Sequence, residues 1–504
     1  MAIAALSQAL IDQWSDPRWR LNNLYRIIDK EGREIPFRMN WAQESLFSEM
    51  HHLNIILKAR QLGFTTIYCL YMLDACLFNS NTSAGVVAHN LDDAENFFRE
   101  KIKFPYDNLP EQLRERIPAT RDAAKSLAFD NGSSIRVGTS LRSGTLQYLL
   151  ISEYGKICAK FPEKAREIRT GALNTIQTGQ SVAIESTAEG RGGDFFQMCQ
   201  DAQKKAQAGT YLTPMDFKFH FFPWFLDPAY SLDPDTVQLS ADDEKYFAAL
   251  RADHKVELTA GQMAWYVKKR ETQMEEMKRE YPSTPDEAFE AAIRGSYFAT
   301  QMRIARKQGR VAPIPIETRL PVNTFWDLGY DDAMAIWFHQ QFGQQHRFVG
   351  YYENHNEGFA HYARKLKEWS AENDVTFGKH FGPHDIEVHL LDAHATTRKE
   401  QAAGVGIVFE TVPRIADKMD AIELARSALS SSWLDSVKCS LGIQHLDNYQ
   451  TAWDEVNGVP RSAPLRNDAV HGADAYQTFA QALDAGMLEE SKGPLPQVTT
   501  DWIR

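Results

Sequence analysis

The chain has 504 residues, of which 43% are hydrophobic and 24% are charged, and its formal net charge is −12. This length predicts about three domains of ordinary size, each large enough to bury a core. The acidic average excludes a protein that coats nucleic acid through its overall field. It leaves open a local basic groove, clustered metal-binding carboxylates or only a solvated surface.

The sequence contains no signal for a membrane segment or a disulfide framework. No apolar run approaches the roughly 18 residues that span a bilayer, and the opening stretch MAIAALSQALIDQWSDPRW lacks a basic start. We therefore expect a cytoplasmic protein. There is no CxxC pair, so we expect reduced, mostly buried cysteines and no zinc cluster. These cysteines are Cys69, Cys76, Cys158, Cys199 and Cys439.

In the first half of the chain, short apolar runs alternate with longer polar and helical stretches, which is typical of a parallel sheet wrapped by helices. The expected strands are 54–57, 84–88, 148–151 and 181–185. Beyond them, HFFPWFLDPAYSLDPD is rich in proline and aromatic residues, and 240–279 is charged and helical. These features predict a small helical appendage. YPSTPDEAF and the proline-spaced VAPIPIETRLP predict a linker that ends near Pro321.

A second sheet is expected to begin with TFWDLGYDDAMAIWFHQ. This run and HRFVGYYENH are both β-rich, and a short turn with glycine joins them, so we expect adjacent antiparallel strands. A helix near 358–372, a strand in KHFGPHDI and a helix over about 468–488 follow. The final stretch, ESKGPLPQVTTDWIR, is expected to be a mobile extension.

The stretch KARQLGFTT lies between an apolar strand and a helical stretch, where phosphate-binding loops occur. The standard loop ends in Gly-Lys-Ser/Thr, whereas Gly63 is followed here by Phe64 and Thr65. Gly63 permits close backbone approach, and Thr65 offers a hydroxyl to Mg²⁺. The positive charge then comes from Lys58 or Arg60. An ordinary strand-to-helix turn is the alternative.

Three further stretches contain residues that suit a nucleotide site. The strand in QYLLISEYG ends in Ser152 and Glu153, where nucleotide hydrolases keep an acid that polarises water. Because Ser152 replaces the usual aspartate, Mg²⁺ would be held more through water. VAIESTAEGRGGDFF ends a strand in Ser186 and Thr187, whose hydroxyls suit a γ-phosphate sensor. Gln43 precedes the first strand, where its amide suits adenine. A buried strand with an exposed glutamate remains the alternative at Glu153.

The order of these motifs resembles the ATPase of the large terminase subunits of tailed double-stranded DNA phages, a relative of helicase motors. KARQLGFTT is similar to a family variant in which the lysine stands at the start of the loop, so the resemblance implies that Lys58 is the phosphate-binding lysine. How Lys58 and Arg60 share the binding of the phosphates stays open. The resemblance also places Arg142 where the family has an arginine that reaches a neighbouring subunit's ATP; a surface arginine is the alternative. The implied nucleotide-binding residues are Gln43, Lys58, Arg60, Gln61, Gly63, Thr65, Thr66, Ser186 and Thr187, with Thr65 also a metal ligand and Glu153 and Arg142 catalytic.

Three acids in the second half end probable strands or start a helical turn: Asp327 in FWDLGY, Asp385 in GPHDIEV and Asp474 in HGADAYQTF. A pair of Mg²⁺ or Mn²⁺ ions needs several carboxylates that converge from different elements, because hard cations take oxygen ligands. Each aspartate alone is also a common turn or cap residue. Asp392 and Asp468 are rivals for the second and third positions.

WDLGYDD, PHDI and HGADA resemble the acidic signatures of the ribonuclease-H-like nuclease domain of large terminases, and they occur in the same order. EYPSTPDEAF resembles the segment that joins motor to nuclease in that family. The resemblance implies that Asp327, Asp385 and Asp474 bind metal and catalyse cleavage. His384 and His471 beside them are expected to be structural or to support the ligands.

The expected fold is α/β, with a helicase-like P-loop (ASCE) ATPase domain at 1–237, a small helical lid and linker at 238–312, a ribonuclease-H-like nuclease domain at 313–488 and a flexible tail at 489–504. The resemblance implies a DNA-packaging ATPase and endonuclease that uses ATP and Mg²⁺, with Mn²⁺ as a substitute in the nuclease site. Its implied partners are double-stranded DNA, a small terminase subunit and the portal protein of the procapsid. A pentameric ring on the portal, in the host cell cytoplasm, is the expected working assembly.

Three other functions are compatible with the sequence. The first is a helicase-like DNA translocase whose second domain is not a nuclease. The second is a catalytically silent adaptor at the portal, which Phe64 and Ser152 suggest. The third, a transposase or resolvase, shares the acidic triad but does not need the ATP motifs of the first half.

Overall fold

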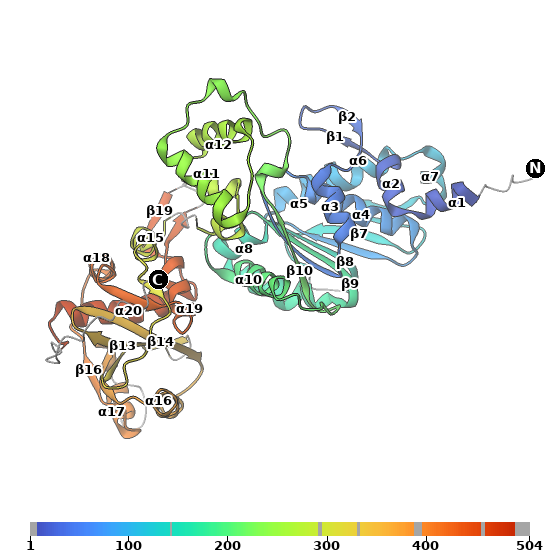
Figure 1. Ribbon diagram of the computed structural model, residues 1–504. Helices are drawn as coiled ribbons and strands as arrows, with labels where there is room; N and C mark the ends of the chain where they lie inside the picture. Colours follow the sequence, from blue (N-terminus) through green and yellow to red (C-terminus); the bar gives the residue numbers. More distant parts are fainter. Residues whose placement is uncertain are drawn as a thin grey trace, which may run out of the picture. The chain divides into compact units, whose positions relative to one another are not determined.

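The chain divides into two compact units, Met1–Ala291 and Ala292–Arg504, in the computed structural model shown in Figure 1. The structure describes residues 8–141, 144–290, 295–329, 333–387, 396–454 and 459–488. The boundary between the units falls inside the segment that the sequence assigns to a lid and linker. The division into four segments stays a prediction.

The first unit is built on an eight-stranded sheet with the order β10-β3-β9-β8-β4-β7-β6-β5. The strands from β10 to β7 are parallel, and β6 and β5 are antiparallel to their neighbours. The four predicted strands are confirmed as β3, β4, β8 and β9, while the other four were not predicted. The strands are β3 (Leu53–Lys58), β4 (Ser83–Val87), β5 (Ala119–Ala123), β6 (Ser126–Phe129), β7 (Ser134–Gly138), β8 (Leu146–Ser152), β9 (Ile176–Ser186) and β10 (Phe217–Phe222).

Helices cover both faces of this sheet, which explains why its central strands are continuous apolar runs. On one face, Ile56 and Leu150 pack with Leu70 of α4. On the other face, Ile55 and Leu149 share a core with α8 and α10. The helices are α1 (Gln8–Ser15), α2 (Pro17–Leu24), α3 (Trp41–Glu49), α4 (Phe64–Phe78), α5 (Leu91–Phe98), α6 (Phe104–Asp107), α7 (Glu111–Arg116), α8 (Tyr154–Lys160), α9 (Pro162–Glu167) and α10 (Gly193–Gln207), and the strands β1 (Arg26–Ile28) and β2 (Glu34–Pro36) form a small hairpin.

The predicted helical stretch over 240–279 is confirmed by α11 (Ala241–His254), α12 (Ala260–Gln273) and α13 (Met277–Glu280), and a further helix, α14 (Pro285–Ala288), lies beyond it in YPSTPDEAF. The predicted lid and linker segment stays a prediction, but the two stretches that suggested a linker are packed. Trp224 Nε1 donates to Ser283 Oγ at 3.0 Å, and Phe289 packs on Phe196, so YPSTPDEAF is a packed part of the first unit. Residues of the second unit form α15 (Ala299–Lys307) and β11 (Val311–Ala312) before Pro321. Burial of aromatic and apolar side chains therefore overrides the proline signals in both segments.

The second unit has a seven-stranded sheet with the order β11-β17-β14-β13-β12-β15-β16. The expected antiparallel pair is confirmed as β13 and β14, in which Ile336 lies opposite Tyr352. The run TFWDLGYDDAMAIWFHQ is not one strand, because it contains both β12 and β13, which pair antiparallel. Besides β11, the strands of this sheet are β12 (Val322–Asp327), β13 (Ala333–Phe342), β14 (Gln345–His355), β15 (Phe377–Gly382), β16 (Phe409–Thr411) and β17 (Ser432–Asp435). A separate two-stranded sheet contains β18 (Thr451–Asp454) and β19 (Val459–Pro464).

The last helix of the second unit packs on its sheet and positions one of the predicted acids. Phe479 of α20 contacts Phe325 of β12 with ring centroids 5.1 Å apart. The predicted helices near 358–372 and 468–488 are confirmed as α16 and α20. The helices are α16 (Phe359–Asn373), α17 (Arg398–Gly404), α18 (Lys418–Ala428), α19 (Ser440–Asn448) and α20 (Ala469–Asp484), and a 3₁₀ turn, η7, spans His384–Glu387.

The predicted α/β fold class is confirmed in both units. In the first, β9 lies between β3 and β8 in a mostly parallel sheet. In the second, three antiparallel strands are followed by β15 and β16 in parallel on the far side of β12. All five cysteines are buried and unpaired. Among the helices of the described residues, none combines the length and apolarity needed to cross a bilayer.

Candidate nucleotide and metal sites

The loop between β3 and α4 has a backbone that favours glycine at its last position. Gly63 has φ +78°, in the left-handed region that disfavours side chains. A Cβ atom there would lie 2.7 Å from Gln43 Nε2. Gln61 is also left-handed, with φ 63°. The loop therefore turns tightly and leaves the first N–H groups of α4 at its end, where an anion is stabilised by the helix.

Gln43 is buried beside this loop and holds its shape. Its Nε2 donates to the carbonyl of Gly63 at 2.8 Å, and its Oε1 accepts from the backbone N–H of Asn40 at 2.9 Å. Asn40 also caps α3 by accepting from the N–H of Gln43. Both ends of the Gln43 amide are thus engaged with protein groups. Its predicted contact with adenine stays a prediction.

Lys58, at the end of β3, lies between two carboxylates. Its Nζ is 3.2 Å from Glu153 Oε1 and 3.1 Å from Glu185 Oε2, and its side chain is 8% exposed. Burial alone would lower the pKa of Lys58, but the two carboxylates raise it above its ordinary value. Burial would likewise raise the pKa of Glu153, yet Lys58 and Lys156 lower it to about 2. Lys58 and Glu153 are therefore both charged at neutral pH.

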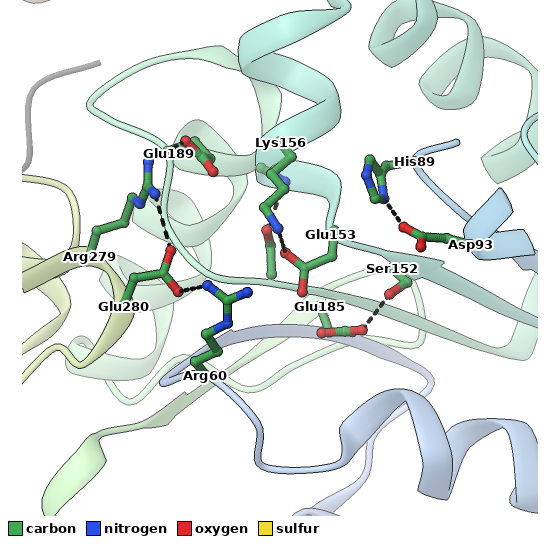
Figure 2. A network of polar contacts seen from close by, with 12 residues as sticks. Arg60, His89, Asp93, Ser152, Glu153, Lys156, Glu185, Glu189, Arg279 and Glu280 are labelled. Carbon is green, nitrogen blue, oxygen red and sulfur yellow. Dashed lines mark hydrogen bonds and ion pairs between the residues drawn. The ribbon is translucent and has the colours of Figure 1, made fainter. Parts of the chain in front are cut away.

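Glu185 is a member of this group that sequence reasoning missed. It is fully buried, and its Oε1 accepts from Thr65 Oγ1 at 2.8 Å and from Ser152 Oγ at 2.6 Å. Figure 2 shows the bond to Ser152 and the position of Glu153 beside it. A charged side chain in a buried strand is costly unless it is paired. The glutamate inside the apolar run VAIES is thus a signal that could have identified it.

Arg60 lies in a different set of ion pairs. Its Nη1 is 3.1 Å from Glu280 Oε2, and Glu280 also contacts Arg279, which in turn contacts Glu189 (Figure 2). Burial raises the pKa of Glu189 above its ordinary value, against the opposing charge of Arg279. The Arg60 side chain is 53% exposed, in contrast to Lys58. The structure thus brings Lys58, rather than Arg60, next to Glu153.

The remaining predicted nucleotide-binding residues surround the same strand ends. Ser186 Oγ accepts from the N–H of Gly155 at 3.1 Å. Thr187 Oγ1 is buried and has no hydrogen-bond partner among the residues that the structure describes. Thr66 Oγ1 lies 3.1 Å from Lys101 Nζ. The predicted arginine, Arg142, lies outside the described residues.

The three predicted acids of the second unit line one pocket. Asp327 ends β12, Asp385 lies in η7 and Asp474 lies on α20, and all three border a cavity of about 270 Å³. His384 borders the same pocket. Asp468 is exposed at the start of α20 and does not line it. The other rival, Asp392, lies outside the described residues.

Basic side chains contact each of these acids. His471 Nδ1 lies 3.2 Å from Asp327 Oδ2, and Lys418 Nζ lies 2.7 Å from Asp474 Oδ1. Arg398 Nη1 lies 3.7 Å from Asp385 Oδ2. Burial raises the pKa of Asp327 to about 6. The hydrogen bond from His471 opposes this rise, and the negative charge of Asp474 adds to it. A buried carboxyl group with a raised pKa beside a second acid is a candidate for a functional site.

The donor set of this pocket fits a divalent cation in its chemistry. Carboxylate oxygens are the ligands that Mg²⁺ and Mn²⁺ prefer. Asp385 Oδ1 is a buried acceptor without a hydrogen-bond partner in the described part of the chain. Within the described residues, however, no three His, Cys, Asp or Glu side chains are gathered closely enough to hold a metal ion. The convergence of the three aspartates on a metal stays a prediction.

No family model and no curated protein matches the chain. Among solved structures, the HK97 bacteriophage large terminase is 12% identical, with 93% of this chain and 99% of that chain covered and a TM-score of 0.45. The large terminase of a thermophilic bacteriophage in complex with ADP is 14% identical, with 85% and 94% covered and a TM-score of 0.28. The large terminase nuclease domain of bacteriophage SPP1 with bound Mn is 13% identical, with 33% and 86% covered and a TM-score of 0.24. The ADP and the Mn belong to those proteins. The first of these likenesses covers most of this chain.

Proposed function

We propose that the chain is the large subunit of a phage terminase, which moves double-stranded DNA with the energy of ATP and cuts it at a second site. The observation that carries the proposal is the group at the ends of β3, β8 and β9. A buried lysine from a glycine loop lies 3.2 Å from Glu153, and the Thr65 hydroxyl lies 2.8 Å from Glu185. This set supplies a cation for phosphates, an acid for water and oxygen ligands for a metal.

In the first site, each residue has a role that its position supports. Lys58 leaves its ion pair with Glu153 and binds the phosphates of ATP, and the N–H groups that begin α4 bind the same phosphates. Glu153 then orients the attacking water. Mg²⁺, when bound with the nucleotide, neutralises charge on the phosphates. Arg60 keeps its ion pair with Glu280 unless nucleotide draws it away.

In the second site, Asp327, Asp385 and Asp474 would hold Mg²⁺ or Mn²⁺, which activates water and stabilises the departing oxygen of a phosphodiester. His471 contacts Asp327 at 3.2 Å and orients that carboxylate. Lys418 neutralises Asp474.

The partners of this proposal follow from the sequence resemblance. They are double-stranded DNA, a small terminase subunit and the portal of the procapsid, on which the chain would form a ring. With a net charge of −12, the chain must grip DNA through local lysine and arginine contacts to phosphate. Binding should therefore tolerate different sequences and weaken steeply with salt.

The test separates the two activities by substitution. ATP turnover with DNA and Mn²⁺-dependent cleavage of plasmid are measured for the wild type, Glu153→Gln and Asp327→Asn. Glu153→Gln should lose turnover and keep cleavage, and Asp327→Asn should do the reverse. Glu163→Gln and Asp484→Asn, at exposed positions outside both sites, are the matched controls and should keep both activities.

Two outcomes would favour the alternatives. No ATP turnover in the wild type, even with DNA and portal present, would support the silent adaptor. Unchanged cleavage by Asp327→Asn would support a helicase-like translocase without a nuclease site at these residues.

A further inference from the structure

The proposed nucleotide site lacks one carboxylate at its usual place. In P-loop hydrolases, Mg²⁺ is held by the loop Ser or Thr and by an aspartate on a neighbouring strand. In this chain, the residue directly before Glu153 is Ser152, which has no charge. A second acid must therefore come from another element if the site is to hold Mg²⁺ in the same way.

The register of β8 and β9 brings Glu185 to that place. Ser152 lies opposite Glu185 in the parallel pair, and residues that are opposite in adjacent strands point to the same face of the sheet. Two residues earlier on each strand, Leu150 and Ala183 both belong to the core that includes α4. Glu185 therefore extends the face of the sheet that the start of α4 covers.

The contacts of Glu185 are those expected of the missing aspartate. Its Oε1 accepts from the loop hydroxyl of Thr65 at 2.8 Å and from Ser152 Oγ at 2.6 Å. Its Oε2 is buried without a hydrogen-bond partner in the described structure, 3.1 Å from Lys58 Nζ. The carboxylate thus joins the loop threonine, the loop lysine and the residue that replaces the aspartate.

A purely structural role for Glu185 explains less of this arrangement. Lys58 already has a counterion in Glu153 at 3.2 Å. A second fully buried carboxylate adds a desolvation cost that a lysine with one counterion does not require. An uncharged side chain would continue the apolar row of Ala183 without that cost.

We propose that Glu185 takes over the role of the missing aspartate. Its carboxylate, supplied from β9 instead of β8, forms the Mg²⁺ site of the nucleotide together with the Thr65 hydroxyl, and Ser152 fixes its orientation by donating a hydrogen bond. This inference rests on the proposed ATP site. It adds that the acidic ligand has moved to the adjacent strand, while Glu153, the proposed catalytic acid, still directly follows β8.

The experiment measures binding rather than turnover. Binding of ATPγS to the full chain is titrated by calorimetry, once with Mg²⁺ and once with EDTA. The wild type should bind at least about tenfold more tightly with Mg²⁺. Glu185→Gln should bind about equally in both conditions and should match the wild type in EDTA within a few-fold. Ser152→Asp combined with Glu185→Gln returns a carboxylate to β8 and should restore the preference for Mg²⁺.

The matched control is Glu287→Gln, which also replaces a buried glutamate of the first unit. Glu287 accepts hydrogen bonds from Tyr246 and Tyr266 and not from the residues of the nucleotide site. Glu287→Gln should keep the wild-type preference for Mg²⁺. If Glu185→Gln keeps that preference, the inference is wrong. If Glu185→Gln does not fold, the double variant decides, because a preference for Mg²⁺ supports the inference and its absence overturns it. If the wild type binds no nucleotide in either condition, the proposed ATP site itself fails, and the inference fails with it.

Discussion

Lys58 Nζ lies 3.2 Å from Glu153 Oε1, so the residue proposed to bind phosphate is paired with the residue proposed to activate water. Lys156 contacts the other oxygen of Glu153 at 3.3 Å, and Glu185 contacts Lys58. Without nucleotide, two cations and two carboxylates therefore balance each other. In the proposed mechanism, an entering triphosphate takes the place of Glu153 at Lys58, which frees Glu153 for water when ATP is present.

The first prediction concerns Lys58→Ala. The substitution leaves Glu185 buried without its cation, and removal of one partner of a buried pair costs about 3–5 kcal/mol. We expect the free energy of unfolding at neutral pH to fall by about this amount, measured by guanidinium titration. Lys278→Ala removes an exposed partner of Glu290 and should cost less than about 1 kcal/mol.

The same variant has a defined dependence on pH. Lys58 helps to hold the pKa of Glu153 at about 2, below its ordinary value of 4.5. In the wild type, this contribution is complete above 4.5 and is lost as the pH falls toward 2. Lys58→Ala should show a flatter stability curve in that window. Parallel curves for the two proteins would contradict the ion pair.

The second prediction concerns Gly63→Ala, compared with Gly32→Ala. Both glycines are left-handed, with φ +78° and +77°, but only at Gly63 would a Cβ meet another atom within 4 Å. Left-handed backbone costs a residue with a Cβ about 1–2 kcal/mol, so both variants should lose that stability. Only Gly63→Ala displaces Gln43 and should also weaken ATPγS binding, measured by calorimetry. Equal nucleotide affinity in both variants would argue against this loop as the binding site.

The third prediction concerns Lys418→Ala in the pocket of the second unit. Lys418 Nζ lies 2.7 Å from Asp474 Oδ1, so it competes with a metal ion for that carboxylate. Because the lysine is 42% exposed, the pair is worth under about 1 kcal/mol, and Mn²⁺ affinity should rise about two- to fivefold. Free Mn²⁺ is measured by electron paramagnetic resonance. Lys399→Ala, which removes a cation from Glu387 outside the pocket, should leave Mn²⁺ affinity unchanged. A fall in affinity on loss of Lys418 would contradict the site.

The fourth prediction concerns His220 on β10. Its Nε2 lies 3.0 Å from Asn54 Oδ1. Burial lowers the pKa of His220 from 6.5 to about 4. The charges of Lys218 and His51 act in the same direction, and the charge of Glu49 opposes them. The unfolded histidine takes up a proton near 6.5 and the folded one does not, so stability is complete above that pH and is lost as the pH falls toward 4. The loss from this group reaches about 3 kcal/mol at most.

His220→Asn removes this titration. Its free energy of unfolding should change less than that of the wild type between about pH 7 and about pH 5. Urea titrations at both pH values measure the difference. If the wild type and the variant lose the same free energy, the folded histidine is protonated and the assignment is wrong.

The sequence allowed the central strands to be predicted but not the whole sheet. Runs such as 54–57 are apolar because both faces of these strands are buried. Strand β10 was missed because Lys218 and His220 interrupt its apolar pattern. His220 is tolerated there because Asn54, distant in sequence, hydrogen-bonds it. The residue pattern of one segment cannot reveal a hydrogen-bond partner that lies in another segment.

The candidate sites show the same limit. Lys58 and Glu153 were predicted because each follows an apolar run next to a recognisable turn. Glu185 was missed because its contacts with Thr65 and Ser152 depend on the register between β8 and β9. Register is set by packing across the sheet. The sequence alone therefore indicates that a buried glutamate needs a partner, but it does not show which residue the partner is.

The most direct test of two sites in one chain is a crystal structure of the full protein with ATPγS and Mn²⁺. We predict that Lys58 Nζ leaves Glu153 and contacts a phosphate oxygen, and that anomalous density for Mn²⁺ lies beside Thr65 and also among Asp327, Asp385 and Asp474. Nucleotide bound elsewhere while Lys58 stays paired with Glu153, or the absence of Mn²⁺ from the three aspartates, would contradict the proposal.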